Sequence, residues 1–86
     1  MSAHETDFQG DVLAAIREAV EGAIAGAHCH VTGGNGHYSL VVSAPAFKGL
    51  SMLASQRPVY AAIAHLMKGA APPIHAVDSL QTRVAE

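Results

Sequence analysis

An α+β fold is predicted, in which helices pack on one face of a three-stranded sheet. Three observations lead to this prediction. Apolar residues recur every four positions over residues 8–24, two β-rich runs flank a glycine-rich turn at 33–36, and a second helical pattern at 59–67 precedes an apolar run at 74–77. The expected order is helix, strand, strand, helical turn, helix, strand. One sheet with helices on one face buries all of these apolar patterns together.

The first helix is expected at about residues 7–25. Its core-facing stripe has the spacing of one helix face and consists of Phe8, Val12, Ile16, Val20 and Ile24. Thr6 followed by Gln9 resembles a capping box, in which side chains bind the free amides of the first helical turn. Gly26 is the expected C-cap.

A hairpin is expected next. The strands are predicted at 28–32 and 38–43, and Gly33-Gly34-Asn35-Gly36 between them is rich in residues that tolerate positive φ. Pro45 ends the second strand because proline cannot donate to a strand ladder.

The second half of the chain is expected to form a helix and a last strand. Residues 46–57 suggest a turn and one or two helical turns, and Pro58 suits the first position of the following helix, which ends near Gly69. After the breaker at 69–73, a third strand is predicted at 74–77, with an extension to Leu80 left open. Residues 81–86 are expected to be a flexible tail and residues 1–6 a flexible start to a single domain over 1–86.

Composition excludes several classes of protein. With 50% hydrophobic and 14% charged residues, the chain is globular and not intrinsically disordered. A net charge of −2 and only five Lys and Arg residues, which are dispersed, argue against nucleic-acid binding, since that normally needs a basic face. A lone cysteine and the absence of any signal-peptide pattern or long apolar run predict a cytoplasmic protein without a membrane segment.

Six histidines are the main candidates for chemistry. His28 and His30 flank Cys29 on a predicted strand, so both imidazoles would share one face and Cys29 would take the other. They could bind a metal if a partner completed the site, but half-exposed strand residues are the favoured interpretation. Cys29 is expected to be a small buried apolar residue. His65 is expected on the surface and His4 in the flexible start.

His37 and His75 are less easily interpreted. His37 ends the glycine turn, where a side chain can reach outward, and His75 lies in the otherwise apolar run Ile-His-Ala-Val. Each could be a ligand or an ordinary polar residue, and residue chemistry leaves both alternatives open. No nucleophile, base and orienting group occur together, so an enzyme is the least favoured class.

Residues 31–77 resemble the BolA-like family, in particular its branch with a glycine-containing loop that ends in histidine. The matching pieces are VTGGNGHYSLVVSAPAFKGLS at 31–51, Val59-Tyr60-Ala61, and IHAV at 74–77. The resemblance implies a fold similar to the class II KH domain, with the order α-β-β-α-β and usually a short last helix. Residues after Val77 lack the family's frequent Thr-Pro-x-x-Trp segment, so that helix is expected to be short or absent.

The resemblance also implies a function. Such proteins partner a monothiol glutaredoxin around a shared [2Fe–2S] cluster, in which the glutaredoxin cysteine and glutathione hold one iron. Carried over by position, the ligands supplied by this chain are His37 and His75, and the isolated chain holds no cofactor. Neutral histidine ligands raise the potential of such a cluster.

Two alternatives from other classes remain open. The first is a nucleic-acid-binding transcriptional regulator with a KH-like surface, although Phe47 to Ser51 has one glycine where an RNA-binding KH domain has a GxxG loop, and Arg57 is the one basic residue in 52–58. The second is an interaction module whose histidines are incidental. The isolated chain is expected to be a monomer or a weak dimer.

Overall fold

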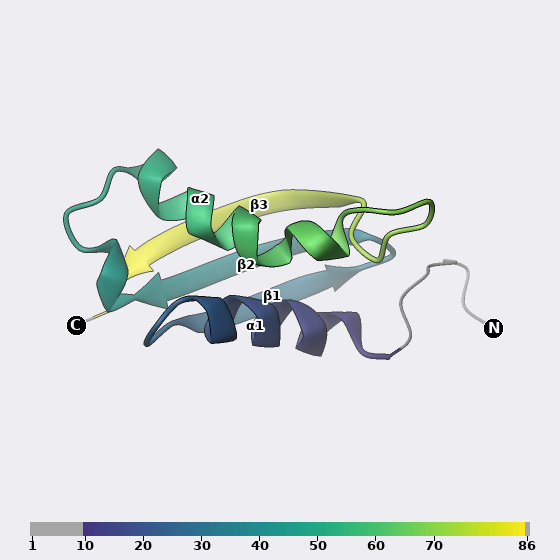
Figure 1. Cartoon of the computed structure of the whole chain (residues 1–86), viewed down its shortest axis with the longest axis horizontal. Coiled ribbons are helices and arrows are strands. Elements are labelled where there is room, and N and C mark those ends of the chain that lie inside the picture. Colours follow the sequence, from purple (N-terminus) through teal and green to yellow (C-terminus); the bar gives the residue numbers. More distant parts are fainter. Residues whose placement is uncertain (1–9, 86) are drawn as a thin grey trace.

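The structure, a computed structural model, describes residues 10–85. Its elements are α1 (Val12–Ala23), β1 (His28–Gly34), β2 (His37–Ala44), α2 (Met52–Ile63) and β3 (Ala76–Val84), with short 3-10 turns η1 (Pro45–Phe47) and η2 (Ala64–Leu66). Figure 1 shows both helices on one face of a three-stranded sheet. The predicted α+β fold and its α-β-β-α-β order are therefore confirmed. The predicted flexible start and the capping box at Thr6 lie outside the described residues.

Strand β2 is the centre of the sheet. It pairs antiparallel with β1 and parallel with β3. A parallel neighbour requires the chain to return to the other end of the sheet, and α2 lies in this crossover connection. The β1–β2 turn and the start of β3 consequently lie at the same end of the sheet, where His37 pairs with Ala76.

The hydrophobic core lies between the sheet and the helices. From α1, Ile16 and Val20 are fully buried, as the stripe of apolar residues predicts. Alternate residues of β2 face the same layer, as expected for a strand covered on one side, and they are Tyr38, Leu40, Val42 and Ala44. Burying one large apolar side chain contributes about 1.5–3 kcal/mol, so this layer supplies most of the driving force for folding.

Helix α1 begins later than predicted. Asp11 is its N-cap, and its Oδ1 accepts a hydrogen bond of 3.2 Å from the amide of Ala14. The helix ends at Ala23, with Ile24 as C-cap, so the predicted C-cap at Gly26 is wrong. Gly26, with φ +72°, instead lies in the turn that leads into β1.

Helix α2 includes Pro58 in its interior, and the prediction that Pro58 begins a helix is wrong. The helix begins at Met52, because the Oγ of Ser51 accepts from the amide of Ala54 at 3.1 Å and so caps the first turn. Proline removes one helical hydrogen bond at a cost of about 3 kcal/mol.

Contacts with β3 hold the turns that precede Pro58. Ser55 donates to the carbonyl of Met52 at 2.7 Å and is bonded to the hydroxyl of Thr82. Gln56 Nε2 donates to the carbonyl of Leu80 at 3.0 Å. These tertiary bonds and the burial of Val59 and Ile63 keep the helix continuous through the proline. Tyr60, between these two buried residues, is 41% exposed.

Strand β3 is longer than predicted, and the flexible tail expected from residue 81 is wrong. Gln81 to Val84 pair in register with Val41 to Ala44, and the amide of Ala85 donates to the carbonyl of Ala44 at 3.2 Å. Side chains of a strand alternate between its two faces, and every second residue from Leu80 to Val84 lies on the helix-covered side of the sheet. These residues pair with the buried residues of β2, which explains why the strand continues. No helix follows β3 up to residue 85.

None of the helices formed by residues 10–85 has the length and apolar character needed to cross a membrane.

Candidate functional site

The turn between β1 and β2 has the geometry of a tight hairpin. Its two central residues, Asn35 and Gly36, have φ values of +54° and +85°. Two consecutive positive φ values define the type I′ turn, whose twist matches that of the flanking strands and for which Asn-Gly is the preferred sequence. Gly34 pairs with His37 across this turn, so His37 is the first residue of β2 and lies at the tip of the sheet.

Backbone hydrogen bonds join this turn to the start of β3. The carbonyl oxygen of Gly36 accepts from the amide of His75 at 2.7 Å and from the amide of Ala76 at 3.0 Å. Ile74, just before His75, is buried and donates its amide to the carbonyl of Leu66 at 3.1 Å. His75 is thus held between a buried anchor and the hairpin turn, and it directly precedes β3 instead of lying within it as predicted.

These bonds place the two predicted histidines side by side. The ring centroids of His37 and His75 are 6.3 Å apart, with an angle of 75° between the ring planes. The imidazole of His75 also covers Gly36, since a Cβ at position 36 would lie 2.6 Å from its Cγ. Both histidines are exposed. The structure therefore brings together two ligand-type side chains that are 38 positions apart in the sequence.

A carboxylate that the sequence interpretation missed lies beside this pair. Asp78 Oδ1 is 3.2 Å from His37 Nδ1, and both side chains are more than half exposed. A signal for it exists in the sequence: Val77 and Leu80 are apolar residues three positions apart in a strand, where a regular strand has a spacing of two or four. Such a spacing indicates one extra residue in the strand.

His28 and His30 do not join this group. Both are exposed on β1, as expected, but His30 pairs with Val41, four residues further along β2 than His37. Four residues of strand correspond to about 13 Å. Within residues 10–85, no set of three or more His, Cys, Asp or Glu side chains is arranged to hold a metal ion. His65 is exposed on η2, as expected.

Cys29 faces the opposite side of β1 and contacts the first helix. Its exposed fraction is 6%, which confirms the prediction of a small buried residue. Burial, and secondarily the negative charge of Glu21, raise the pKa of its thiol to about 11, although Arg17 partly opposes the shift. A thiol with this pKa is almost entirely protonated near neutral pH and is a poor metal ligand.

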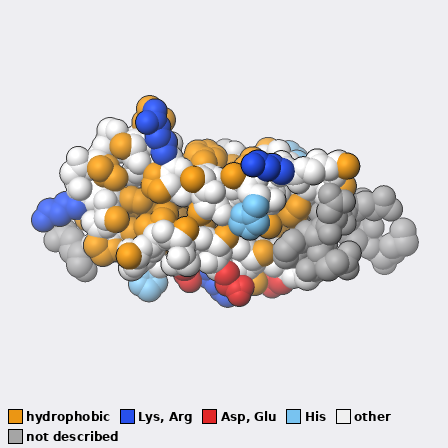
Figure 2. Space-filling view, in the orientation of Figure 1, with side chains coloured by type: hydrophobic (Ala, Val, Ile, Leu, Met, Phe, Trp, Pro, Cys, Tyr) orange, Lys and Arg blue, Asp and Glu red, His pale blue; other side chains and the backbone are white. Residues whose placement is uncertain are grey.

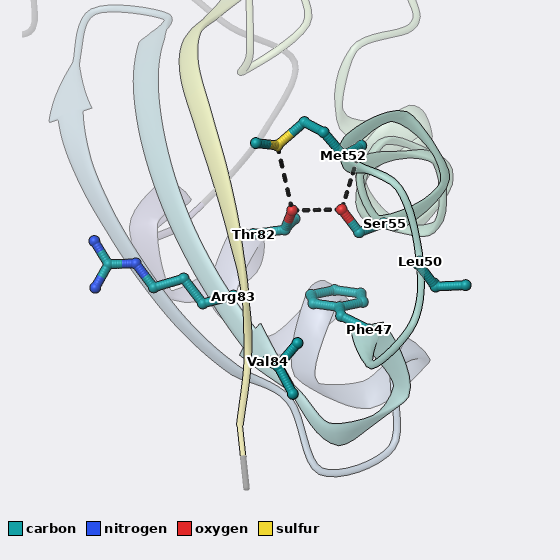
Figure 3. A pocket seen from close by; sticks show the side chains of 7 residues that line it. All are labelled: Phe47, Leu50, Met52, Ser55, Thr82, Arg83 and Val84. Carbon is teal, nitrogen blue, oxygen red and sulfur yellow. Dashed lines mark hydrogen bonds between the residues drawn. The ribbon is translucent and has the colours of Figure 1, made fainter.

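A second surface feature lies at the other end of the sheet. Figure 3 shows a hollow between η1, the start of α2 and the end of β3, lined by Phe47, Leu50, Met52, Ser55, Thr82, Arg83 and Val84. Its two hydroxyl groups, on Ser55 and Thr82, bind each other and leave the rest of the lining largely apolar. Figure 2 shows apolar side chains gathered over this end of the molecule. Met52 and Leu53, at the start of α2, are exposed.

Basic side chains do not gather into a patch on the face shown in Figure 2, where Lys and Arg groups are separated by apolar and neutral surface. This agrees with the dispersed basic residues of the sequence. Nothing on this face resembles the continuous positive surface that phosphate binding favours.

The comparisons with known proteins agree with this fold. The family model described as BolA-like protein matches residues 6–86. A solved structure of a BolA protein homologue from Coxiella burnetii is 30% identical, with a TM-score of 0.68, over 80% of this chain and 85% of that one. The solution structure of BolA1 from Mus musculus has the same fold, with 24% identity and a TM-score of 0.65, over 98% of this chain and 73% of that one.

A search of curated protein sequences found no match. The family model nevertheless spans almost the whole chain, from residue 6 to its last residue. Together with the structural similarity to the Coxiella protein, this match establishes the family. The chain belongs to the BolA-like protein family.

Proposed function

We propose that this chain is a non-enzymatic iron–sulfur accessory or regulatory protein that binds a monothiol glutaredoxin around a shared [2Fe–2S] cluster. His37 and His75 would bind one iron, and the glutaredoxin cysteine and glutathione would bind the other. The proposal includes the cytoplasmic location predicted from the sequence, since a reducing compartment keeps the thiolate ligands available.

The observation that supports this proposal most directly is the pairing of His37 and His75. Two exposed imidazoles meet at one tip of the sheet, with ring centroids 6.3 Å apart. Each iron of a [2Fe–2S] cluster takes two protein-type ligands, and Rieske centres use two histidines on one iron and two thiolates on the other. The donor set of this tip therefore fits one iron of such a cluster.

The same count explains why a partner is required. Closed metal sites in proteins commonly use four ligands, and residues 10–85 bring no third His, Cys, Asp or Glu into a metal-binding arrangement with this pair. The buried thiol of Cys29 faces the helix layer and cannot add one. A second protein that brings two thiolates would complete the ligand set.

Within this proposal, the chain orients two nitrogen donors. The hairpin turn fixes His37, and the backbone bonds of Gly36 fix His75. When bound, the cluster supplies one-electron chemistry, and histidine ligands raise its reduction potential. Binding requires neutral imidazoles, because a protonated ring has no free lone pair.

The test is anaerobic cluster reconstitution with a monothiol glutaredoxin and glutathione, followed by visible circular dichroism. Wild type is expected to form a heterodimer whose spectrum differs from that of the glutaredoxin homodimer. His37→Ala and His75→Ala should each alter or abolish that spectrum. His28→Ala is the matched control, because His28 is also exposed but pairs with Ser43, six residues further along β2 than His37. A spectrum that stays that of glutaredoxin alone in the wild type would contradict the proposal.

A further inference from the structure

Strand β3 contains one extra residue opposite the step from Tyr38 to Ser39 of β2. Tyr38 is in register with Val77 and Ser39 with Ser79, so Asp78 is the residue inserted by the bulge. A bulge interrupts the ladder locally and changes the direction of a side chain, and bulges recur beside functional sites.

The apolar pattern of β3 requires this insertion. Val77 and Leu80 both pack against the core although they are three positions apart. In a regular strand, an odd spacing sends two side chains to opposite faces of the sheet. The extra residue restores the alternation, and it also places a carboxylate next to the first residue of β2.

The contact made by Asp78 contributes little to stability. Its Oδ1 lies 3.2 Å from His37 Nδ1, but the two side chains are 55% and 57% exposed. Water and salt screen an ion pair or hydrogen bond at such a position, and exposed pairs of this kind are usually almost neutral in free energy. The main effect of the contact is therefore on the orientation of the His37 ring.

The hydrogen bond determines which ring nitrogen carries the proton. An ionised carboxylate only accepts hydrogen bonds, so Nδ1 of His37 must be the donor, and in the neutral ring the lone pair then lies on Nε2. Metal-binding histidines commonly donate their second ring N–H to a carboxylate or carbonyl, which fixes the tautomer and makes the ligating nitrogen more basic.

We propose that Asp78, presented by the β3 bulge, is a positioning residue that holds His37 in the Nδ1–H tautomer, with Nε2 as the iron-binding nitrogen. This inference rests on the proposed function for its iron, but the tautomer itself is a property of the chain alone.

The backbone contacts of His75 do not involve Asp78. His75 is held through its own backbone amide, which donates to Gly36, and its ring lies over that glycine. His37 has a ring contact from a side chain, at 3.2 Å. Removing Asp78 should therefore change the ring of His37 and leave the backbone position of His75 intact.

The first measurement is NMR of the ring nitrogens of His37 in the chain without metal, at a mildly alkaline pH where the neutral imidazole dominates. Wild type is expected to show the Nδ1–H tautomer, and Asp78→Ala a shift of population toward Nε2–H. Asp78→Asn retains a side-chain oxygen acceptor and should restore most of the wild-type signature. Glu18→Ala, which removes an exposed charge on α1, is the matched control for net charge and should change nothing.

The second measurement is reconstitution with glutaredoxin and glutathione. Asp78→Ala is expected to weaken cluster retention by the heterodimer about 10- to 100-fold, the usual effect of losing such a partner of a metal ligand, and to change the visible circular dichroism. Identical ring signals in Asp78→Ala and wild type would overturn the inference, as would altered ring signals with an unchanged cluster. If wild type itself forms no cluster with glutaredoxin, the proposed function fails, and the role of Asp78 toward iron fails with it.

Discussion

Gly36 is the residue that allows His37 and His75 to lie so close together. Its φ is +85°, and a Cβ there would lie 2.6 Å from Cγ and 2.8 Å from Nδ1 of His75. Gly36→Ala is therefore expected to displace the His75 ring and to lower the free energy of unfolding by about 1–3 kcal/mol, as for other strained backbone positions. Urea unfolding and NMR contacts between the two rings measure both effects.

Gly34→Ala is the control in the same turn, since a Cβ at position 34 would meet no atom within 4 Å beyond its chain neighbours and the φ of Gly34 is not positive. It should keep both the ring contacts and the stability of wild type. If Gly36→Ala behaved like Gly34→Ala, the close approach of the glycine to His75 would have no structural importance.

The buried thiol of Cys29 makes the stability of the fold depend on pH in the alkaline range. Its folded pKa of about 11 lies above the ordinary thiol value of 9.0. Between these two pH values the unfolded chain releases the thiol proton while the folded chain keeps it, so stability falls as pH rises through this window. The shift corresponds to a loss on the order of 2–3 kcal/mol.

Denaturant unfolding from neutral pH to above the folded pKa of Cys29 checks this prediction, with Cys29→Ala as reference. The variant lacks the thiol but keeps every other titrating group, so the difference between the two curves isolates Cys29. A difference that stayed constant with pH would contradict the raised pKa.

Among the site residues, the two histidines are predicted from the sequence and the carboxylate is not. His37 and His75 are assigned through resemblance to a family, because residue chemistry alone does not decide between ligand and ordinary surface residue. Asp78 is not predicted because its position depends on a bulge in the pairing of β2 with β3, which is a tertiary feature. The three-residue spacing of Val77 and Leu80 is the available sign of that bulge.

At the scale of elements, α2 shows a local rule overridden by tertiary contacts. Pro58 lies in its interior, while Ser55 and Gln56 attach the preceding turn to β3. Pro58→Ala restores the missing amide and is expected to stabilise the fold by about 1–3 kcal/mol. This range is the cost of a proline inside a helix, reduced because proline also lowers the conformational entropy of the unfolded chain. Thermal or urea unfolding measures the gain.

Pro45→Ala is the matched control, because Pro45 is at the start of η1, where an amide has no helical partner. This variant should show no gain in stability. Equal effects of the two substitutions would mean that the position of Pro58 inside α2 carries no cost.

The elements themselves are predicted well where one periodic pattern dominates and less well at their ends. The apolar stripe of α1 and the alternation of β2 indicate the correct type of element. The start of α2 depends on the cap at Ser51, and the end of β3 depends on pairing with Val41 to Ala44. The cap at Ser51 is one of several possible helix starts, and the β3 pairing joins residues far apart in the sequence. A local apolar pattern therefore identifies neither boundary.

At the scale of the whole molecule, the histidine pair and the apolar hollow lie at opposite ends of the sheet. Residues 37–44 of β2 connect them, and Val84 at the hollow pairs with Ala44. The chain is elongated, with its longest dimension, 44 Å, more than twice the others, 19 and 17 Å (Figure 1). A partner that shares a metal with His37 and His75 therefore has to approach the tip formed by the hairpin turn and the start of β3.

This arrangement predicts that the chain holds a cluster only in complex with glutaredoxin, and not when it is isolated. The isolated chain, with two imidazoles at its tip, is expected to hold no cluster after reconstitution, whereas a one-to-one mixture with glutaredoxin and glutathione should hold one per heterodimer. Native mass spectrometry measures this stoichiometry. Leu53→Asp, an exposed change on α2 near the hollow, should leave it unchanged, while His75→Ala should reduce it. A cluster retained by the isolated chain, or lost in Leu53→Asp but not in His75→Ala, would place the binding surface elsewhere than at the histidine tip.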